Sequence, residues 1–241
     1  MTKVLRPLAL APAAAVVFSL TMLTPAIQAG TITVGLPAYS KTGNCIPFGC
    51  AAGVIGTFTE YQQIYSSTAF PSGGPITGIS FLNTQEPAGS IDSATYTFWL
   101  STTSVSVGGL SSTLSSNIGP DNTEFFSGVL SGPITGGIFT VTGTPFDYDP
   151  ASGNLLLDIL ISNPTSIGGS SVFLDVSNAS PATTERAYVD DGVSKAGGGG
   201  LITQFTFTPI STSVPEPSTL GLGSISLLLL AIARCRRSSK S

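Results

Sequence analysis

Three side chains with oxygen ligands for a metal ion lie close together in the sequence: Asp147, Asp149 and Asn154. Calcium takes about six to eight oxygen ligands, and this loop offers carboxylate and amide oxygens. The loop departs from an EF-hand because no acidic residue closes it and Pro150 stiffens it. Turn formation by itself also accounts for Asp, Pro, Gly and Asn in this order. We therefore expect no cofactor, and calcium at this loop is an alternative that remains open.

The single tryptophan, Trp99, is a candidate for stacking on a sugar ring. Alternation along its segment puts Tyr96, Phe98 and Leu100 on one face and Trp99 on the other, together with Thr97. An outward tryptophan on a sandwich can form a platform for a sugar. Burial in the core is the commoner position of tryptophan in sandwiches, and this alternative stays open.

The chain contains no histidine, which limits the chemistry that it can perform. The commonest general base and the commonest zinc ligand are missing, so serine–histidine and cysteine–histidine catalysis are excluded. The remaining enzymatic candidate is a pair of carboxyl groups acting on a glycosidic bond, about 5–10 Å apart. Twelve acidic residues lie between residues 30 and 214, so chance alone supplies such a pair. We therefore expect a protein without catalytic activity.

The same segment, residues 30–214, is strongly acidic. It contains 12 acidic residues and only three cations, Lys41, Arg186 and Lys195, which gives a formal charge of −9. Such a surface repels phosphate backbones, so we expect no nucleic-acid partner. The charge is compatible with solubility or with the binding of cations.

Short strands must position these side chains, because residues 30–213 show no helical period of useful length. Hydrophobic residues make up 41% of the chain and charged residues only 9%, and short apolar runs recur between Gly, Pro, Ser and Asn. Residues 154–161 are apolar on both faces except at Asp158, which predicts a central strand covered on both sides. Asp190-Asp191-Gly192 predicts a hairpin turn. The pattern predicts ten strands, at residues 31–34, 56–65, 76–82, 94–101, 124–130, 137–142, 154–162, 171–176, 186–189 and 201–208. Ten short strands predict a single all-β domain at residues 30–213, a β-sandwich or jelly roll.

The first 29 residues are typical of a secretory signal peptide. Lys3 and Arg6 precede an apolar stretch over residues 8–23, and small residues follow. We expect a helix here and cleavage by signal peptidase after Ala29. Ile27 at the −3 position makes the usual cleavage pattern imperfect. An uncleaved membrane anchor is the alternative.

The segment 214–241 combines a proline-rich motif, an apolar run and a basic end. The motif is Val214-Pro215-Glu216-Pro217-Ser218, and the basic end contains Arg234, Arg236 and Arg237. The apolar run of about 15 residues spans roughly 22 Å as a helix. That length is short of the ~30 Å hydrocarbon core of a membrane, so flanking residues must extend this transmembrane helix. The positive-inside rule leaves the arginines in the cytoplasm and residues 30–213 on the far side.

In this order the three features resemble the PEP-CTERM sorting signal, which occurs in Gram-negative bacteria that make extracellular polysaccharide. The resemblance implies recognition by a membrane-embedded exosortase, cleavage near Pro215-Glu216-Pro217, and release or attachment of the domain outside the cell. It covers about 27 of the 241 residues, and the combination of motif, span, basic end and signal peptide makes it specific. A plain tail anchor is the alternative. Three stretches of the body also resemble other PEP-CTERM proteins, which have no assigned activity: 119–123, 132–141 and 146–159.

The three cysteines divide between the body, with Cys45 and Cys50, and the basic tail, with Cys235. Removal of the tail leaves an even pair, and an oxidising compartment favours a disulfide between them. A turn through Pro47 and Gly49 can bring the two Cα atoms within the about 4.4–6.8 Å that a disulfide requires. A free pair or a metal clip is the alternative, although two thiolates without histidine make a poor zinc site.

The expected function is that of an exported protein that passes transiently through the inner membrane and ends on the cell surface or in the extracellular matrix. We expect a structural or adhesive role associated with extracellular polysaccharide, with signal peptidase and exosortase as processing partners. A carbohydrate-binding module is the second hypothesis, based on the expected sandwich and Trp99. A glycan-processing enzyme is the third.

Overall fold

The structure is a computed structural model that describes residues 30–35, 43–50, 58–85, 88–165, 171–177 and 179–208. The expected signal peptide with Ala29 and the segment 214–241 lie outside these residues. No helix in the described ranges is long and apolar enough to cross a membrane. The described part contains ten strands and two 3-10 helices. In chain order they are β1 (Gly30–Val34), β2 (Phe58–Tyr65), η1 (Ser67–Ala69), β3 (Gly74–Leu82), β4 (Ser90–Thr103), η2 (Leu114–Asn117), β5 (Thr123–Pro133), β6 (Ile138–Tyr148), β7 (Asn154–Thr165), β8 (Thr184–Asp190), β9 (Val193–Ala196) and β10 (Thr203–Phe207).

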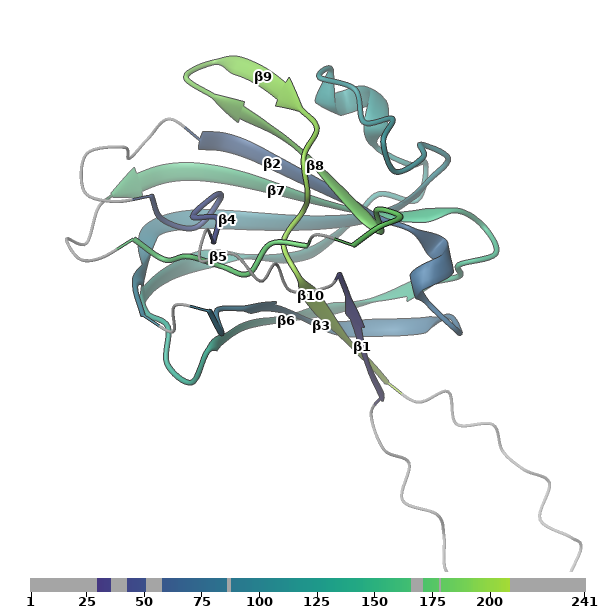
Figure 1. Cartoon of the computed structure of the whole chain (residues 1–241), viewed down its shortest axis with the longest axis horizontal. Helices are drawn as coiled ribbons and strands as arrows, with labels where there is room; N and C mark the ends of the chain where they lie inside the picture. Colours follow the sequence, from purple (N-terminus) through teal and green to yellow (C-terminus); the bar gives the residue numbers. More distant parts are fainter. Residues whose placement is uncertain are drawn as a thin grey trace, which may run out of the picture.

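Antiparallel pairing joins these strands into two sheets (Figure 1). The four-stranded sheet has the order β1-β10-β3-β6, and the six-stranded sheet has the order β5-β4-β7-β2-β8-β9. The sheets face each other as the two layers of a β-sandwich, which is the all-β class predicted from the sequence. The first and last strands are neighbours, because Gly30 of β1 pairs with Phe207 of β10.

Alternation along the strands fills the space between the sheets with large apolar side chains. Along β4, Tyr96 and Phe98 are buried, and Phe81 of β3 and Phe205 of β10 are buried opposite them. The rings of Tyr65 and Phe205 meet edge to face with their centroids 4.8 Å apart. Each buried aromatic side chain removes about 150–250 Å² from water, so these rings dominate the core.

A second, smaller apolar cluster lies on the outer face of the six-stranded sheet. Residues 104–122, between β4 and β5, form a segment that we name the cover loop. Its Leu110 and Leu114 pack against Ile64 of β2 and Leu156 of β7. This part of the sheet is therefore covered on both sides, while the rest of its outer face is open.

The turn of the β8–β9 hairpin was predicted from the sequence, and strand β9 was not. Asp191 and Gly192 form its turn with φ values of +50° and +72°, the geometry of a two-residue hairpin turn. The sequence predicted this turn but not β9, all four residues of which are exposed. A short strand without a buried face carries no hydrophobic pattern.

Three further expectations need correction. Residues 171–176 do not form a regular strand, because Leu174 bridges Asn44 and Val176 bridges Leu201, one isolated pairing each. Strand β7 is not covered along its whole length, since Leu160 is 42% exposed beyond the cover loop. Strand β6 continues to Tyr148, well past the predicted end at residue 142.

Candidate functional site

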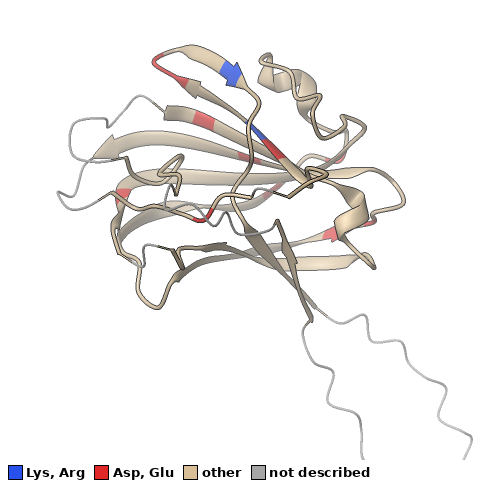
Figure 2. Ribbon diagram, in the orientation of Figure 1, with Lys and Arg blue, Asp and Glu red and all other residues tan. Residues whose placement is uncertain are grey.

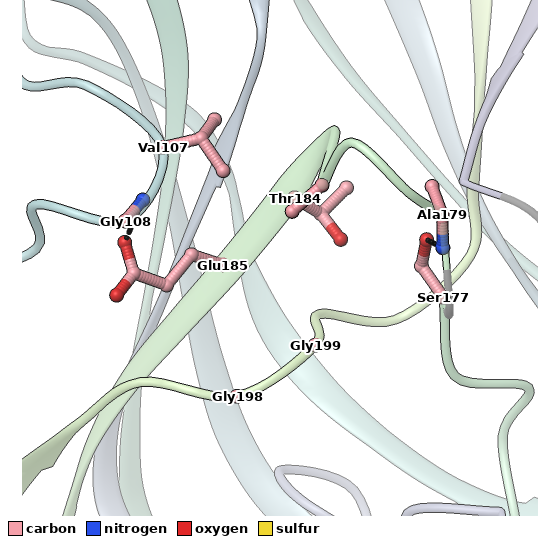
Figure 3. Close-up of a pocket in the computed structure, with 9 residues that line it drawn as sticks. Val107, Gly108, Ser177, Ala179, Thr184, Glu185, Gly198 and Gly199 are labelled. Carbon is pink, nitrogen blue, oxygen red and sulfur yellow. Dashed lines mark hydrogen bonds between the residues drawn. The ribbon is translucent and has the colours of Figure 1, made fainter.

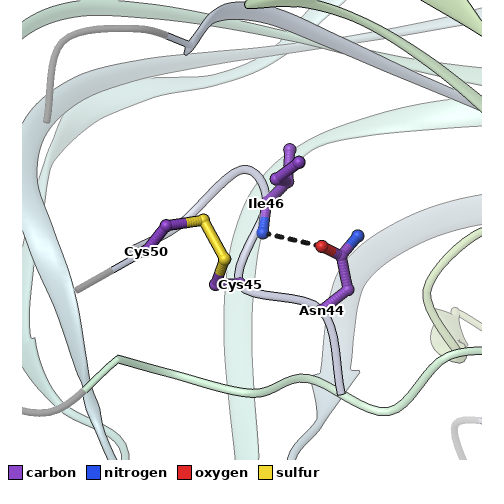
Figure 4. The surroundings of a disulfide bond; sticks show 4 residues. All are labelled: Asn44, Cys45, Ile46 and Cys50. Carbon is purple, nitrogen blue, oxygen red and sulfur yellow. Dashed lines mark hydrogen bonds between the residues drawn. A yellow bond between two sulfur atoms is a disulfide. The ribbon is translucent and has the colours of Figure 1, made fainter. Parts of the chain in front are cut away.

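Cys45 and Cys50 are joined by a disulfide bond with an S–S distance of 1.98 Å and a Cα–Cα distance of 4.8 Å (Figure 4). The turn between them is closed by the carbonyl of Cys45, which accepts hydrogen bonds from the backbone N–H groups of Phe48 and Gly49 at 2.9 Å. The side chain of Asn44 accepts a further hydrogen bond from Ile46 N at 3.2 Å. The two body cysteines are thus oxidised in a compact turn.

The same turn inserts Phe48 between the two sheets, which the sequence did not reveal. The Phe48 ring is fully buried and lies 5.0 Å from Phe81, 5.1 Å from Phe139 and 5.4 Å from Tyr96, measured between ring centroids. The Phe48 carbonyl accepts a hydrogen bond from Asp92 N at 2.8 Å. The disulfide turn therefore places Phe48 in the core between the two sheets, and this is a structural role.

The two aspartates of the candidate calcium loop have different positions. Asp147 is exposed and belongs to β6, where it pairs with Pro75 of β3. Asp149 lies in the turn after β6, where Oδ1 accepts from Ala151 N at 2.9 Å and Oδ2 accepts from Ser152 Oγ at 3.0 Å. Asp149 therefore stabilises the turn with both of its carboxylate oxygens.

Asn154, the third candidate ligand, joins two other segments of the chain. Its Oδ1 accepts from Ser67 N at 2.8 Å, and its Nδ2 donates to the Val105 carbonyl at 2.7 Å. The described residues hold no group of three or more Asp, Glu or Cys side chains placed for a metal ion. The geometry of this loop favours turn formation over calcium binding.

Trp99 lies on the outer face of the six-stranded sheet, the face that alternation predicts for it. It is half-buried, with Glu124 of β5 on one side and Asp158 of β7 on the other. Thr95 and Thr97 share this face. Its indole Nε1 is buried and has no hydrogen-bond partner within the described ranges. Trp99 is thus neither a core residue nor a fully exposed platform.

Asp158 continues the same row of side chains on the central strand β7. It is only 4% exposed, and its neighbour across β2 is Gln62. Burial first, and then the negative charge of Glu60, raise the pKa of Asp158 to about 7, while a hydrogen bond with Gln62 opposes the rise. Asn117 of the cover loop fixes Gln62, because its Nδ2 donates to Gln62 Oε1 at 2.9 Å. A carboxyl group poised between two protonation states at neutral pH is typical of functional sites, but Asp158 Oδ1 is closed off from solvent.

Glu185 of β8 holds the cover loop against the sheet. It is 8% exposed, and its Oε2 accepts hydrogen bonds from Gly108 N at 2.7 Å and Leu110 N at 3.1 Å. Charge-assisted hydrogen bonds of this kind are roughly twice as strong as neutral ones. No local pattern in the sequence singles out this residue, because its two partners lie more than 70 residues away.

A pocket of about 430 Å³ opens beside Glu185 (Figure 3). Its walls come from the cover loop at Val107, from the segment that leads into β8, and from Gly198 and Gly199 between β9 and β10. Gly198 and Gly199 belong to a run of four glycines at residues 197–200, and this run thus contributes to the pocket wall. The sequence alone does not reveal this cavity, because three distant segments build it.

Charged residues are sparse along the described chain, and most are acidic (Figure 2). The two described cations lie on one hairpin: Arg186 is 5.5 Å and Lys195 is 5.6 Å from the centroid of the Tyr188 ring. Lys195 Nζ also forms an ion pair with Asp190 at 2.6 Å. Lys195 is therefore paired within the hairpin, whereas Arg186 Nε and Nη1 are buried without a hydrogen-bond partner in the described ranges.

Residues 213–237 match the family described as the PEP-CTERM protein-sorting motif. The match includes the Val214–Ser218 motif and the arginines of the basic end. A search of curated proteins and a search of solved structures found no match to the chain. The motif supports exosortase-dependent sorting to the cell surface, with export and a transient membrane-anchored state on the way. The chain therefore carries a PEP-CTERM sorting motif behind a β-sandwich body.

Proposed function

We propose that this chain is an exported, non-catalytic β-sandwich protein with a structural or adhesive role at the cell surface or in the extracellular matrix, associated with extracellular polysaccharide. The sorting motif at residues 213–237 carries the proposal. The last described strand, β10, ends at Phe207, so cleavage near Pro215-Glu216-Pro217 leaves all ten described strands on one fragment. Sorting and processing can thus proceed without damage to the folded body.

Two properties of the body support this location. The disulfide between Cys45 and Cys50 fits an oxidising compartment outside the cytoplasm. The open part of the outer sheet face carries neutral hydroxyl-bearing side chains, such as Thr97 of β4 and Ser127 of β5, whose hydroxyl groups lie 3.1 Å apart. Neutral hydroxyl groups can exchange hydrogen bonds with polysaccharide and create no charge repulsion.

Exosortase dependence provides the direct test. An antibody against the body would follow the chain in a host with exosortase and in an otherwise identical strain without it. We expect a shortened form at the cell surface or in the matrix only when exosortase is present. Replacement of Pro215, Glu216 and Pro217 by alanine should trap the full-length chain in the membrane fraction.

Thr212→Ala is the matched control, because residue 212 lies just outside the matched range. This variant should be processed like the wild type. Cytoplasmic accumulation of the wild type, or an intact tail in cells that possess exosortase, would contradict the proposal.

A carbohydrate-binding module is the second candidate. The half-buried Trp99 beside Thr95 and Thr97 favours it, because an aromatic edge among hydroxyl groups suits contact with a sugar. Binding of the protein to a glycan array tests this candidate. Trp99→Ala should lower the affinity at least tenfold if this face carries the binding.

A further inference from the structure

The pocket beside Glu185 lies at the edge of β8, beyond the end of its pairing with β9. Arg186 N donates to the Gly198 carbonyl at 3.3 Å, and the Arg186 carbonyl accepts from Gly197 N at 2.9 Å. In an antiparallel strand the N–H and C=O groups of every second residue point to the same side. The N–H and C=O groups of Thr184, two residues earlier, therefore point to this same edge. Thr184 lines the pocket and is 3% exposed, and its Oγ1 accepts a hydrogen bond from Gly200 N at 3.2 Å. Its backbone N–H and C=O therefore lie at the buried wall of the pocket.

Glu185 adds a buried carboxylate to this edge. Its Oε2 is held by the two N–H groups of the cover loop, and within the described ranges Oε1 receives no hydrogen bond. Figure 3 shows the second carboxylate oxygen pointing away from Gly108. Glu185 lines the pocket, and a carboxylate fixed in this way is a rigid acceptor for a donor group that reaches Oε1.

The remaining walls are small and uncharged. Val107, Ala179 and Ala182 line the cavity, and none of them makes a deep apolar site for a large hydrophobic side chain. The carboxylate of Glu185 would repel an anionic ligand. A cationic ligand would approach the guanidinium of Arg186, which lies next to the pocket wall: a Cβ atom at Gly198 would be 3.8 Å from Arg186 Nε.

From these contacts we infer that the pocket is a binding site for one unit of a neutral saccharide. A sugar hydroxyl donates to Glu185 Oε1, a second hydroxyl bonds the Thr184 backbone, and a C–H face of the ring lies on Val107. The volume of about 430 Å³ falls within the roughly 300–1,000 Å³ range of small-molecule sites. This inference rests on the carbohydrate-binding candidate and places its site at the edge of β8 instead of at Trp99.

The test uses the full-length chain, purified in mild detergent, and a panel of neutral hexasaccharides (gluco-, xylo- and manno-configured), with polygalacturonate as the carboxylated probe. We expect measurable binding to at least one neutral probe by calorimetry. Ala182→Trp fills the pocket from an exposed position and should weaken this binding at least tenfold. Glu185→Gln keeps an acceptor for the cover loop but loses the carboxylate, and it should weaken binding by a similar factor.

Ala151→Trp is the matched control, because it makes the same substitution at an exposed alanine in the turn after β6. It should bind like the wild type. Thermal unfolding of each variant separates a lost site from a lost fold. If Trp99→Ala loses binding and the pocket variants retain it, the protein binds glycans but this pocket is not the site.

The other outcomes are equally decisive. If no neutral or carboxylated probe binds, the carbohydrate-binding candidate and the pocket assignment both fail. If polygalacturonate binds more tightly than every neutral probe, and Ala182→Trp abolishes that binding, the pocket is a site but the neutral-sugar assignment is overturned. Displacement of the sugar by an extended peptide at equal concentration would likewise assign this edge of β8 to peptide binding.

Discussion

Trp99 of β4 and Asp158 of β7 lie directly opposite each other on the outer face of the six-stranded sheet. Each carries a buried polar atom that lacks a hydrogen-bond partner within the described ranges: the indole Nε1 and the carboxyl Oδ1. An unsatisfied buried polar group costs about 1–3 kcal/mol, and more if it is charged. Protonation of Asp158 removes the charge, so the stability of this row depends on pH.

We expect Asp158→Asn to stabilise the protein above pH 7. The pKa of Asp158 rises from 3.8 to about 7 on folding, mainly because the carboxyl group is buried. Between about pH 4 and pH 7, Asp158 is therefore protonated in the folded state and ionised in the unfolded state. The unfolding free energy declines as the pH rises through this range. Asparagine carries no charge at any pH. Urea unfolding should show a gain of roughly 2–4 kcal/mol at pH 8 and little change at pH 4.

Two neighbouring acids supply the controls for this prediction. Glu60 is the second cause of the raised pKa of Asp158. Glu60→Gln should therefore lower the pH at which the unfolding free energy stops declining. Glu124 lies in the same row on β5 but is exposed, and Glu124→Gln should leave the pH dependence unchanged. Equal slopes for Asp158→Asn and the wild type between pH 4 and 7 would show that another group titrates.

Local patterns were sufficient to predict the fold class and several strands. The alternation through Tyr96 and Phe98 placed Trp99 on the correct face of β4, because side chains on a strand alternate strictly. The turn at Asp191 and Gly192 was predicted because few other residues adopt positive φ. These features depend only on residues that are adjacent in the sequence.

The candidate site could not be predicted in the same way. The open position of Leu160 depends on where the cover loop ends, and a distant segment determines this. The row of Trp99 and Asp158 requires the register between β4 and β7, which no single strand specifies. The pocket beside Glu185 requires three segments to meet. Long-range register and loop placement are tertiary properties that local patterns do not contain.

We expect Phe48→Ala to be among the most destabilising single substitutions in the body. The ring is fully buried and touches aromatic side chains from both sheets, including Phe81 and Tyr96. Truncation of a buried phenylalanine leaves a cavity and costs about 3–5 kcal/mol. Chemical unfolding measures this loss. Val129→Ala, at a position that is 68% exposed, is the control and should change the unfolding free energy little.

The disulfide is expected to contribute less than the ring that it flanks. Cys45 and Cys50 are separated by 5 positions, and closure of so short a loop stabilises by about 2 kcal/mol in the chain-entropy account. Replacement of both cysteines by serine should therefore cost less than Phe48→Ala. A larger loss would mean that the disulfide also holds Phe48 in place.

Thiol labelling connects the disulfide to processing. Cys235 lies in the basic tail, so the processed protein should react with a maleimide only after reduction, at two positions. The unprocessed chain should react at one position before reduction. Reaction at Cys45 or Cys50 in the exported protein without reductant would contradict an oxidised pair.

Glu185→Ala should loosen the cover loop without unfolding the sandwich. The substitution removes the acceptor for Gly108 N and Leu110 N, and the loss of buried partners costs about 1–3 kcal/mol. Hydrogen exchange should therefore accelerate over residues 105–118, while exchange in β3 and β10 stays unchanged. Glu185→Gln restores an oxygen acceptor and should recover most of the protection. Uniform acceleration across both sheets would show that Glu185 supports the whole fold and not the cover loop alone.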